Sequence, residues 1–401
     1  MRALICVLFA LASSLFGAEL YDFDLCAPAF SSWDNKRSEG GVLSVGGSAS
    51  VRGALQFDDR NAPDRFRELQ LRGSFEARCV NENGFFKITA DAVRENAKDA
   101  AARSDAELSE AYFQARLGAA DIKLGRQIVA WGKSDLLRVT DALNPLDSQE
   151  PGMSDVGDLR LGVAMARLDY YIDDWNLQAI AIPEARYSKR PHYPSEFMPY
   201  DVGDTHKPKS TQGALAAIGV FESWDISFYA ASLHLDEFRN HAKAAMFGAA
   251  AAIAIDDFLI KGETAVWRAN GGDYMRFDML AGADYSGVRD TTITVEAMFR
   301  HTKNDRVDLL MASAGSQSDY EESLAARIQR DLLNASLRLS ATTTIGLSDD
   351  KGGGALRIQG DYEIANNYLL TAGFIAYFGD LEPYKSFDRN DRVFTRMKVS
   401  F

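Results

Sequence analysis

The end of the chain alternates strictly between apolar residues and polar or charged residues. Over residues 392–401, every second side chain from Val393 to Phe401 would share one face of an extended strand, and the bases Arg392, Arg396 and Lys398 would share the other. A period of two is typical of a strand whose two faces meet different surroundings. The same alternation recurs from residue 42 onward, with turn residues between the segments. The chain is therefore predicted to be all-β.

The connectors between the alternating segments are sorted by length. Counted back from the C-terminus, every second connector is tight, and the connectors between these are longer. Short turns at one end and longer loops at the other are typical of a transmembrane antiparallel up-and-down β-barrel, whereas a β-sandwich has no reason to sort its loops. About eighteen strands are predicted, with sixteen as the alternative count. The tight turns are Asn366-Asn367, Asp331-Leu332, Gly287-Val288, Asp256-Asp257, Ser223-Trp224 and Asp173-Asp174, and the longer connectors are 379–390, 347–353, 302–318, 270–274, 184–208 and 129–158.

Charge decides which face of the strands points inward. In the segment 354–364, for example, Ile358 and Tyr362 lie opposite Arg357 and Asp361. Too many ionised groups share the polar face for it to form a dry core, so this face is predicted to line a water-filled lumen while the apolar face meets lipid. The formal net charge of −13 argues against a nucleic-acid partner.

The N-terminus has the pattern of a secretory signal peptide. A basic residue, Arg2, precedes an apolar run that is shorter than the ~20 residues needed to span a membrane. We expect Sec export with cleavage after Ala18. The domains expected are a signal peptide (1–18), a periplasmic N-terminal segment (19–41) and a barrel in the outer membrane of a Gram-negative bacterium (42–401).

Two cysteines, Cys26 and Cys79, would remain in the mature chain. Both fall on the periplasmic side of the predicted topology, and the periplasm is oxidising. A disulfide between them is predicted, and two free thiols are the alternative.

The longest connector, 129–158, opens with a distinctive sequence. Gly-Arg-Gln-Ile-Val-Ala-Trp-Gly-Lys spans residues 125–133, and the turn sequence Asn-Pro-Leu-Asp follows at 144–147. A loop of this length is usually functional or folded inward, so we expect it to narrow the pore; the alternative is that it packs at the rim. The candidate constriction residues are Arg126, Gln127, Trp131, Lys133, Arg138, Asn144 and Asp147.

Together with 325–332, 378–380 and 391–394, this Gly-Arg-Gln…Trp-Gly…Asn-Pro…Asp pattern resembles a proteobacterial outer-membrane β-barrel family of unknown function, allied with alginate-export-like porins. The resemblance implies an outer-membrane channel and no particular substrate. Phe401 resembles the terminal aromatic residue through which such barrels engage the barrel-assembly machinery. Lys133 stands where an acidic residue is common in the family, and the chain is shorter than many of its relatives.

Among the side chains predicted to face the lumen, bases outnumber acids. Rings of arginine and lysine favour anions, so a mild anion preference is one interpretation. Neutralising cross-strand pairs that hold the barrel in shape are the other. The candidate pore-lining residues are Arg72, Lys87, Arg116, Arg276, Glu296, Arg300, Arg338, Arg357, Arg396 and Lys398.

These observations predict a porin-like channel for passive passage of small polar solutes, anionic ones among them. The alternative is a non-conducting surface barrel whose extracellular loops, 129–158 and 184–208, bind a partner or a polysaccharide. The other expected partners are the lipid bilayer and lipopolysaccharide.

An enzyme is not predicted. The sequence has no Gly-x-Ser-x-Gly motif, and the pair Ser232 and His234 lacks a recognisable third group. His192 and His206 lie near two aspartates, but their spacing matches no metal-site template. No cofactor and no metal are expected.

Overall fold

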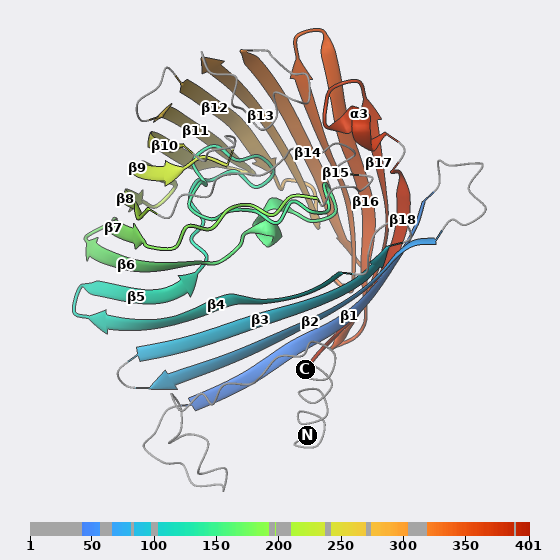
Figure 1. Cartoon of the computed structure of the whole chain (residues 1–401), viewed down its shortest axis with the longest axis horizontal. Coiled ribbons are helices and arrows are strands. Elements are labelled where there is room, and N and C mark those ends of the chain that lie inside the picture. Colours follow the sequence, from blue (N-terminus) through green and yellow to red (C-terminus); the bar gives the residue numbers. More distant parts are fainter. Residues whose placement is uncertain are drawn as a thin grey trace, which may run out of the picture.

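The computed structural model describes residues 42–56, 66–81, 84–97, 103–191, 197, 210–236, 242–269, 274–303, 319–388 and 390–401. An 18-stranded antiparallel sheet closes on itself, since each strand pairs with its neighbours in sequence and β18 pairs with β1 (Figure 1). The strands are β1 (Val42–Gln56), β2 (Phe66–Asn81), β3 (Gly84–Ala97), β4 (Arg103–Leu117), β5 (Ala120–Gln127), β6 (Val163–Ile172), β7 (Trp175–Ile182), β8 (Gln212–Val220), β9 (Trp224–His234), β10 (Lys243–Ile255), β11 (Phe258–Ala269), β12 (Met275–Tyr285), β13 (Thr291–Lys303), β14 (Tyr320–Leu332), β15 (Leu337–Ser348), β16 (Lys351–Ala365), β17 (Tyr368–Gly379) and β18 (Arg392–Ser400), with the short helices η2 (Val156–Leu159) and α3 (Tyr384–Phe387) in connectors.

The predicted barrel and its count of eighteen strands are confirmed. Closure depends on the C-terminal strand, whose register with β1 runs from Ser48 opposite Ser400 to Gln56 opposite Arg392. The terminal Phe401 extends this ladder by exchanging two backbone hydrogen bonds with Gly47, of 2.9 and 3.0 Å. In a closed sheet every strand has two partners, which is the condition for a β-structure to span lipid. Among the described residues, no helix is long and apolar enough to span a bilayer.

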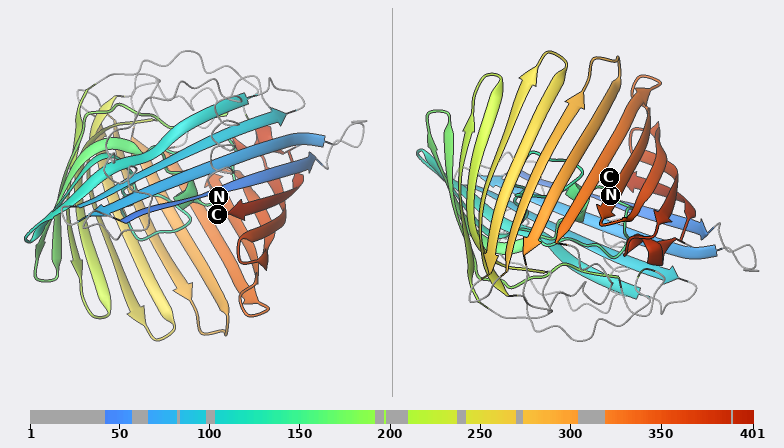
Figure 2. Two further views of the ribbon diagram at one scale, coloured as in Figure 1. Left: turned by 90° about the horizontal axis from the view of Figure 1, so that it is seen from below. Right: turned by 90° about the horizontal axis from the view of Figure 1, so that it is seen from above.

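The two faces of the strands are sorted as the alternation predicted. In β11 the side chains of Phe258 and Ile260 are exposed, whereas Lys261 and Glu263 are buried inside the barrel. On the neighbouring β10, Phe247 is 66% exposed while Met246 is fully buried. Exposed large apolar side chains occur around the whole outer wall, which is the surface a bilayer would cover. The strands of this wall run side by side with a strong tilt (Figure 2).

Most of the tight turns lie where the sequence predicts them. Asp173 and Asp256 begin two-residue turns with positive φ angles of 47° and 50°. Aspartate adopts this left-handed conformation more readily than most residues, so it suits a tight hairpin.

Two connector predictions are wrong. The connector 347–353, predicted to be long, is a tight turn, because β15 continues to Ser348 and pairs there with Lys351. The three glycines 352–354, which resemble a loop in sequence, continue β16 in register with β15. The tight turn predicted at Asp331-Leu332 lies slightly later, at residues 333–336, because β14 extends to Leu332.

The predicted signal peptide, the cleavage after Ala18 and the N-terminal segment 19–41 lie outside the described residues. Cys79 lies in β2, and its predicted partner Cys26 lies outside the described residues, so the disulfide stays a prediction.

Candidate functional site: a segment that crosses the lumen

The connector between β5 and β6, residues 128–162, lies inside the ring of strands (Figure 1). We call it the inward segment, with a first half of residues 128–144 and a second half of residues 145–162. One side chain, Asn144, joins its two ends. Its Oδ1 accepts a hydrogen bond from the Val129 amide at 2.8 Å, and its Nδ2 donates to the carbonyls of Gln127 at 3.2 Å and Leu161 at 2.8 Å. Asn144 is 1% exposed, so its hydrogen bonds between the two ends of the segment are shielded from water.

The first half packs against an apolar part of the inner wall. Trp131 stacks on Tyr229 at 4.6 Å between ring centroids, and its Nε1 donates to Gln178 at 3.3 Å. The prediction of a polar lumen holds only in part over β6–β14, where alanines and other apolar residues point inward beside buried charged residues such as Lys261 and Glu263 and leave room for the segment. The buried cluster includes Trp131, Leu136, Leu137, Val139 and Leu143 of the segment and Ala214, Ala231, Met246, Ala250, Ala265, Trp267, Leu280 and Met298 of the wall.

A buried carboxylate in β11, Glu263, holds the backbone of the first half. It accepts hydrogen bonds from the amides of Lys133 at 2.5 Å, Ser134 at 2.7 Å and Thr140 at 3.0 Å, and from the Thr140 hydroxyl at 2.7 Å. Gly132 beside it has a φ of +85°, and a Cβ there would lie 2.6 Å from the Glu263 carboxylate. The turn around the carboxylate therefore requires glycine at this position.

A second carboxylate, Glu296 in β13, binds the next backbone amides of the first half in the same way. It is fully buried and accepts from the amides of Asp135 at 2.7 Å, Leu136 at 3.0 Å and Leu137 at 2.9 Å. An irregular segment has amides with no ladder partner, and a carboxylate supplies several acceptors at once. The buried Lys261 pairs with Asp135 at 2.5 Å and lies 3.8 Å from Glu296, which balances part of the charge.

The second half reaches the opposite wall. Its Glu150 accepts from Gln70 of β2 at 2.6 Å and pairs with Arg52 of β1 at 2.6 Å. Arg52 also pairs with Glu68, so this guanidinium has a wall carboxylate as well as the one from the segment. Asp147 lies three residues before Glu150 in the second half, and burial raises the pKa of its carboxyl group.

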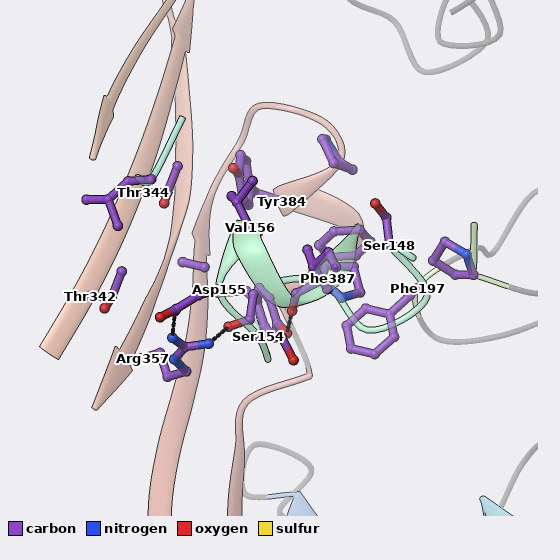
Figure 3. Close-up of a pocket in the computed structure, with 18 of the residues that line it drawn as sticks. Ser148, Ser154, Asp155, Val156, Phe197, Thr342, Thr344, Arg357, Tyr384 and Phe387 are labelled. Atoms are coloured by element: carbon purple, nitrogen blue, oxygen red, sulfur yellow. Dashed lines mark hydrogen bonds and ion pairs between the residues drawn. The ribbon is translucent and has the colours of Figure 1, made fainter. Parts of the chain in front are cut away.

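Farther along, the second half contacts β14, β16 and β17, and Figure 3 shows the contact of Asp155 with Arg357 of β16. Asp155 pairs with Arg357 of β16 and, at 3.4 Å, with Arg327 of β14. Arg357 also donates to the Gly152 carbonyl at 3.0 Å, and the Tyr377 hydroxyl donates to the Pro151 carbonyl at 2.6 Å. The inward segment is thus fixed to both sides of the barrel and divides the lumen.

A cavity of about 500 Å³ remains between the second half and the wall of β15–β17 (Figure 3). Phe197, Tyr377 and Phe387 form an edge-to-face cluster on one side of it. Tyr384 of α3 closes another side, and burial raises the pKa of its phenol, which keeps it neutral. The lining is mainly apolar, with Arg357 and Asp155 at its edge.

The predicted constriction residues are brought together in part. Trp131, Lys133, Arg138, Asn144 and Asp147 belong to the inward segment, whereas Arg126 and Gln127 end β5. Lys133 pairs with Asp225 at 2.7 Å, Arg138 donates to the Asn144 carbonyl at 3.0 Å, and Arg126 pairs with Glu184 and donates to the Gly162 carbonyl at 3.2 Å.

The predicted pore-lining residues are spread along the barrel. Arg276 and Arg300 share the buried Asp278 at 3.0 and 2.7 Å, and Lys87 lies between Glu76 and Glu110. The side chains of Arg116 and Arg338 are 74% and 52% exposed and lie near strand ends, whereas Glu296, predicted to line the pore, is covered by the first half. Arg72, Arg357, Arg396 and Lys398 share the inward phase of their strands.

Sequence reasoning missed the roles of Glu150, Asp155 and Glu263. Glu150 and Asp155 lie in the predicted loop and resemble ordinary solvated acids. In sequence, Glu263 belongs to the polar face of its strand, which is predicted to line a water-filled lumen, and its hydrogen bonds join residues as far apart as 130 positions. The one available signal is Gly132, since a glycine after a buried aromatic residue indicates a close approach of the backbone.

The fold and the lumen-crossing segment define the class of protein: an 18-stranded barrel with the fold of outer-membrane porins. The chain belongs to the family described as "Protein of unknown function (DUF1302)", whose pattern it matches over residues 48–401. No curated protein matches the sequence.

Solved structures share the fold at low sequence identity. OprD of Pseudomonas aeruginosa is 12% identical with a TM-score of 0.54, over 91% of this chain and 96% of that chain. OccK2 (OpdF) of Pseudomonas aeruginosa, in complex with glucuronate, is 13% identical with a TM-score of 0.54, over 90% and 98%. A BenF-like porin from Pseudomonas fluorescens Pf-5 is 12% identical with a TM-score of 0.55, over 90% and 99%.

Proposed function

We propose that this protein is an outer-membrane channel, and not an enzyme, through which small polar solutes pass passively, with a preference for anions. The inward segment narrows the passage. The porin fold of its structural relatives and the apolar outer wall support placement in the outer membrane, in contact with lipid and lipopolysaccharide. The exposed Phe401 at the closing strand fits the expected role in barrel assembly.

The anion preference is supported by arginines on the wall that faces away from the first half. Arg52 of β1 and Arg396 of β18 are direct partners across the seam, and Arg72 and Arg392 lie on adjoining strands. Arg52 is paired with Glu68 and Glu150, and Arg392 lies 3.4 Å from Glu68, so the preference for anions depends on Arg72 and Arg396. In the described ranges, no carboxylate lies within ion-pair distance of Arg72 or Arg396. Cationic side chains that face a pore favour anions.

A non-conducting barrel that binds a partner or polysaccharide through its loops is the second candidate. The feature that favours it is the inward segment, because its two-sided attachment narrows the lumen. An alliance with alginate-export-like porins remains a prediction, and it would require a passage wide enough for a linear acidic polysaccharide.

Purified protein in planar lipid bilayers tests the proposal. We expect discrete conductance steps, and in a KCl gradient we expect a reversal potential displaced toward the equilibrium potential of chloride. Liposome swelling with neutral sugars and organic acids then gives the solute range. A silent bilayer together with absent swelling contradicts the channel, whereas clear cation selectivity contradicts the anion preference alone.

A further inference from the structure

One row of the lumen wall carries two bases and one hydroxyl side by side. In the strand register, Thr342 of β15 is the direct partner of Arg327 on β14 and of Arg357 on β16. Two guanidinium groups and a hydroxyl therefore face the same part of the lumen. Guanidinium groups bind carboxylates through parallel hydrogen bonds, so this row has the chemistry of a carboxylate site.

The only carboxylate paired with these two arginines in the described part of the chain is Asp155. The contact of the second half with Arg52 differs from this one, because Arg52 pairs with Glu68 from the wall as well as with Glu150 from the inward segment. If Asp155 moved away, Arg327 and Arg357 would face the lumen without a counter-charge. The site thus needs an anion, and the segment supplies one.

Asp155 is also accessible enough to be exchanged. Its side chain is 40% exposed, whereas that of Arg357 is 8% exposed and fixed by the Gly152 carbonyl. The cavity of about 500 Å³ opens beside this pair, and its aromatic and aliphatic lining suits a compact apolar body (Figure 3). A carboxylate attached to such a body could bind the arginines while its apolar part fills the cavity.

Resting on the proposed channel function, we propose that Arg327, Thr342 and Arg357 form a binding site for the carboxylate of an organic acid with a compact apolar body. Asp155 occupies this site in the absence of solute and holds the second half across the lumen. The arriving acid takes the place of Asp155, releases this side of the inward segment and widens the passage. The exchange is non-covalent: one ion pair replaces another.

Conductance in planar bilayers tests the exchange with the full-length protein. Asp155→Asn removes the internal anion, and Asp158→Asn, an exposed aspartate three residues away, is the matched control. We expect Asp155→Asn to raise the time-averaged conductance by roughly twofold or more, because the constriction sets the current. Asp158→Asn should match the wild type. Circular dichroism and heat-shifted gel mobility verify that each barrel is folded.

A second set of conductance measurements adds cyclohexanecarboxylate as the solute. Cyclohexylmethanol is the neutral control, and acetate is the carboxylate control that lacks the apolar ring. Cyclohexanecarboxylate should raise wild-type conductance at concentrations at which the other two have no effect, and Arg357→Gln should abolish the response. Equal conductance of Asp155→Asn and Asp158→Asn, or an undiminished response in Arg357→Gln, overturns the inference. Either result leaves the channel proposal standing if solutes still swell liposomes; silent bilayers and absent swelling overturn both.

Discussion

The two halves of the inward segment are held in different ways. The first half is bound through its backbone, by two buried carboxylates that together accept hydrogen bonds from six amides and one hydroxyl, and through an apolar cluster. The second half is bound mainly through side chains, by the ion pairs of Glu150 and Asp155 and a hydroxyl from Tyr377. Several bonds to one buried acceptor must break together, whereas a half-exposed ion pair can be exchanged singly.

This difference separates a fixed part of the constriction from an adjustable part. We infer that the first half is as stable as the barrel itself, since moving it would uncover buried carboxylates. The second half can move at a smaller free-energy cost. Variants of each half test this division.

Replacing the Glu263 anchor should have the largest effect. Glu263→Ala leaves three amides, of which that of Thr140 is buried, and one hydroxyl without their acceptor, which should lower the free energy of unfolding by about 3–5 kcal/mol. Urea unfolding in detergent micelles, followed by tryptophan fluorescence, measures this. Glu363→Ala, at an exposed glutamate of β16, is the control and should change stability by less than about 0.5 kcal/mol. Equal midpoints for the two variants contradict a fixed first half.

Replacing Asn144, which joins the two ends of the inward segment, should have the second-largest effect on stability. Asn144→Ala deletes three hydrogen bonds and leaves the Val129 amide without its acceptor, for a loss of about 2–4 kcal/mol. Because both ends of the segment loosen, proteolysis within residues 128–162 of the folded barrel should also speed up. An Asn144→Ala variant as stable and as resistant to proteolysis as the wild type would mean that packing alone holds the two ends of the segment together.

Gly132→Ala tests the close approach to Glu263. The new Cβ would lie 2.6 Å from the carboxylate and 2.7 Å from the Thr140 hydroxyl, at a φ that alanine rarely adopts. We expect a loss of about 1–3 kcal/mol in the same urea experiment. Gly53→Ala provides the comparison, because a Cβ there meets nothing within 4 Å. Similar costs at the two positions would show that the turn is not tight.

Glu150→Gln should have the smallest effect. Arg52 keeps its Glu68 partner, and the new amide can still accept a hydrogen bond through its oxygen, so the loss should stay below about 1 kcal/mol. A cost equal to that of Glu263→Ala would mean that the second half is anchored as firmly as the first.

The sequence predicts the barrel well because each strand residue has only two environments, and their alternation is visible without knowledge of partners. Connector lengths predict most of the turns but fail at residues 352–354, where glycines continue a strand. The inward segment is harder to predict. Glu263 and Glu363 look alike in sequence, because each is an acid on the polar face of its strand. They differ only in that the inward segment covers Glu263. Such long-range contacts leave no periodic trace.

We infer that the inward segment narrows an open barrel. The most direct test replaces residues 148–159, most of the second half, with two glycines and compares the single-channel conductance of this variant with that of the wild type. Leu146 and Arg160 lie side by side, so a short link can join the cut ends. We predict a folded barrel with several-fold higher conductance. An equally folded barrel with unchanged conductance would contradict the claim.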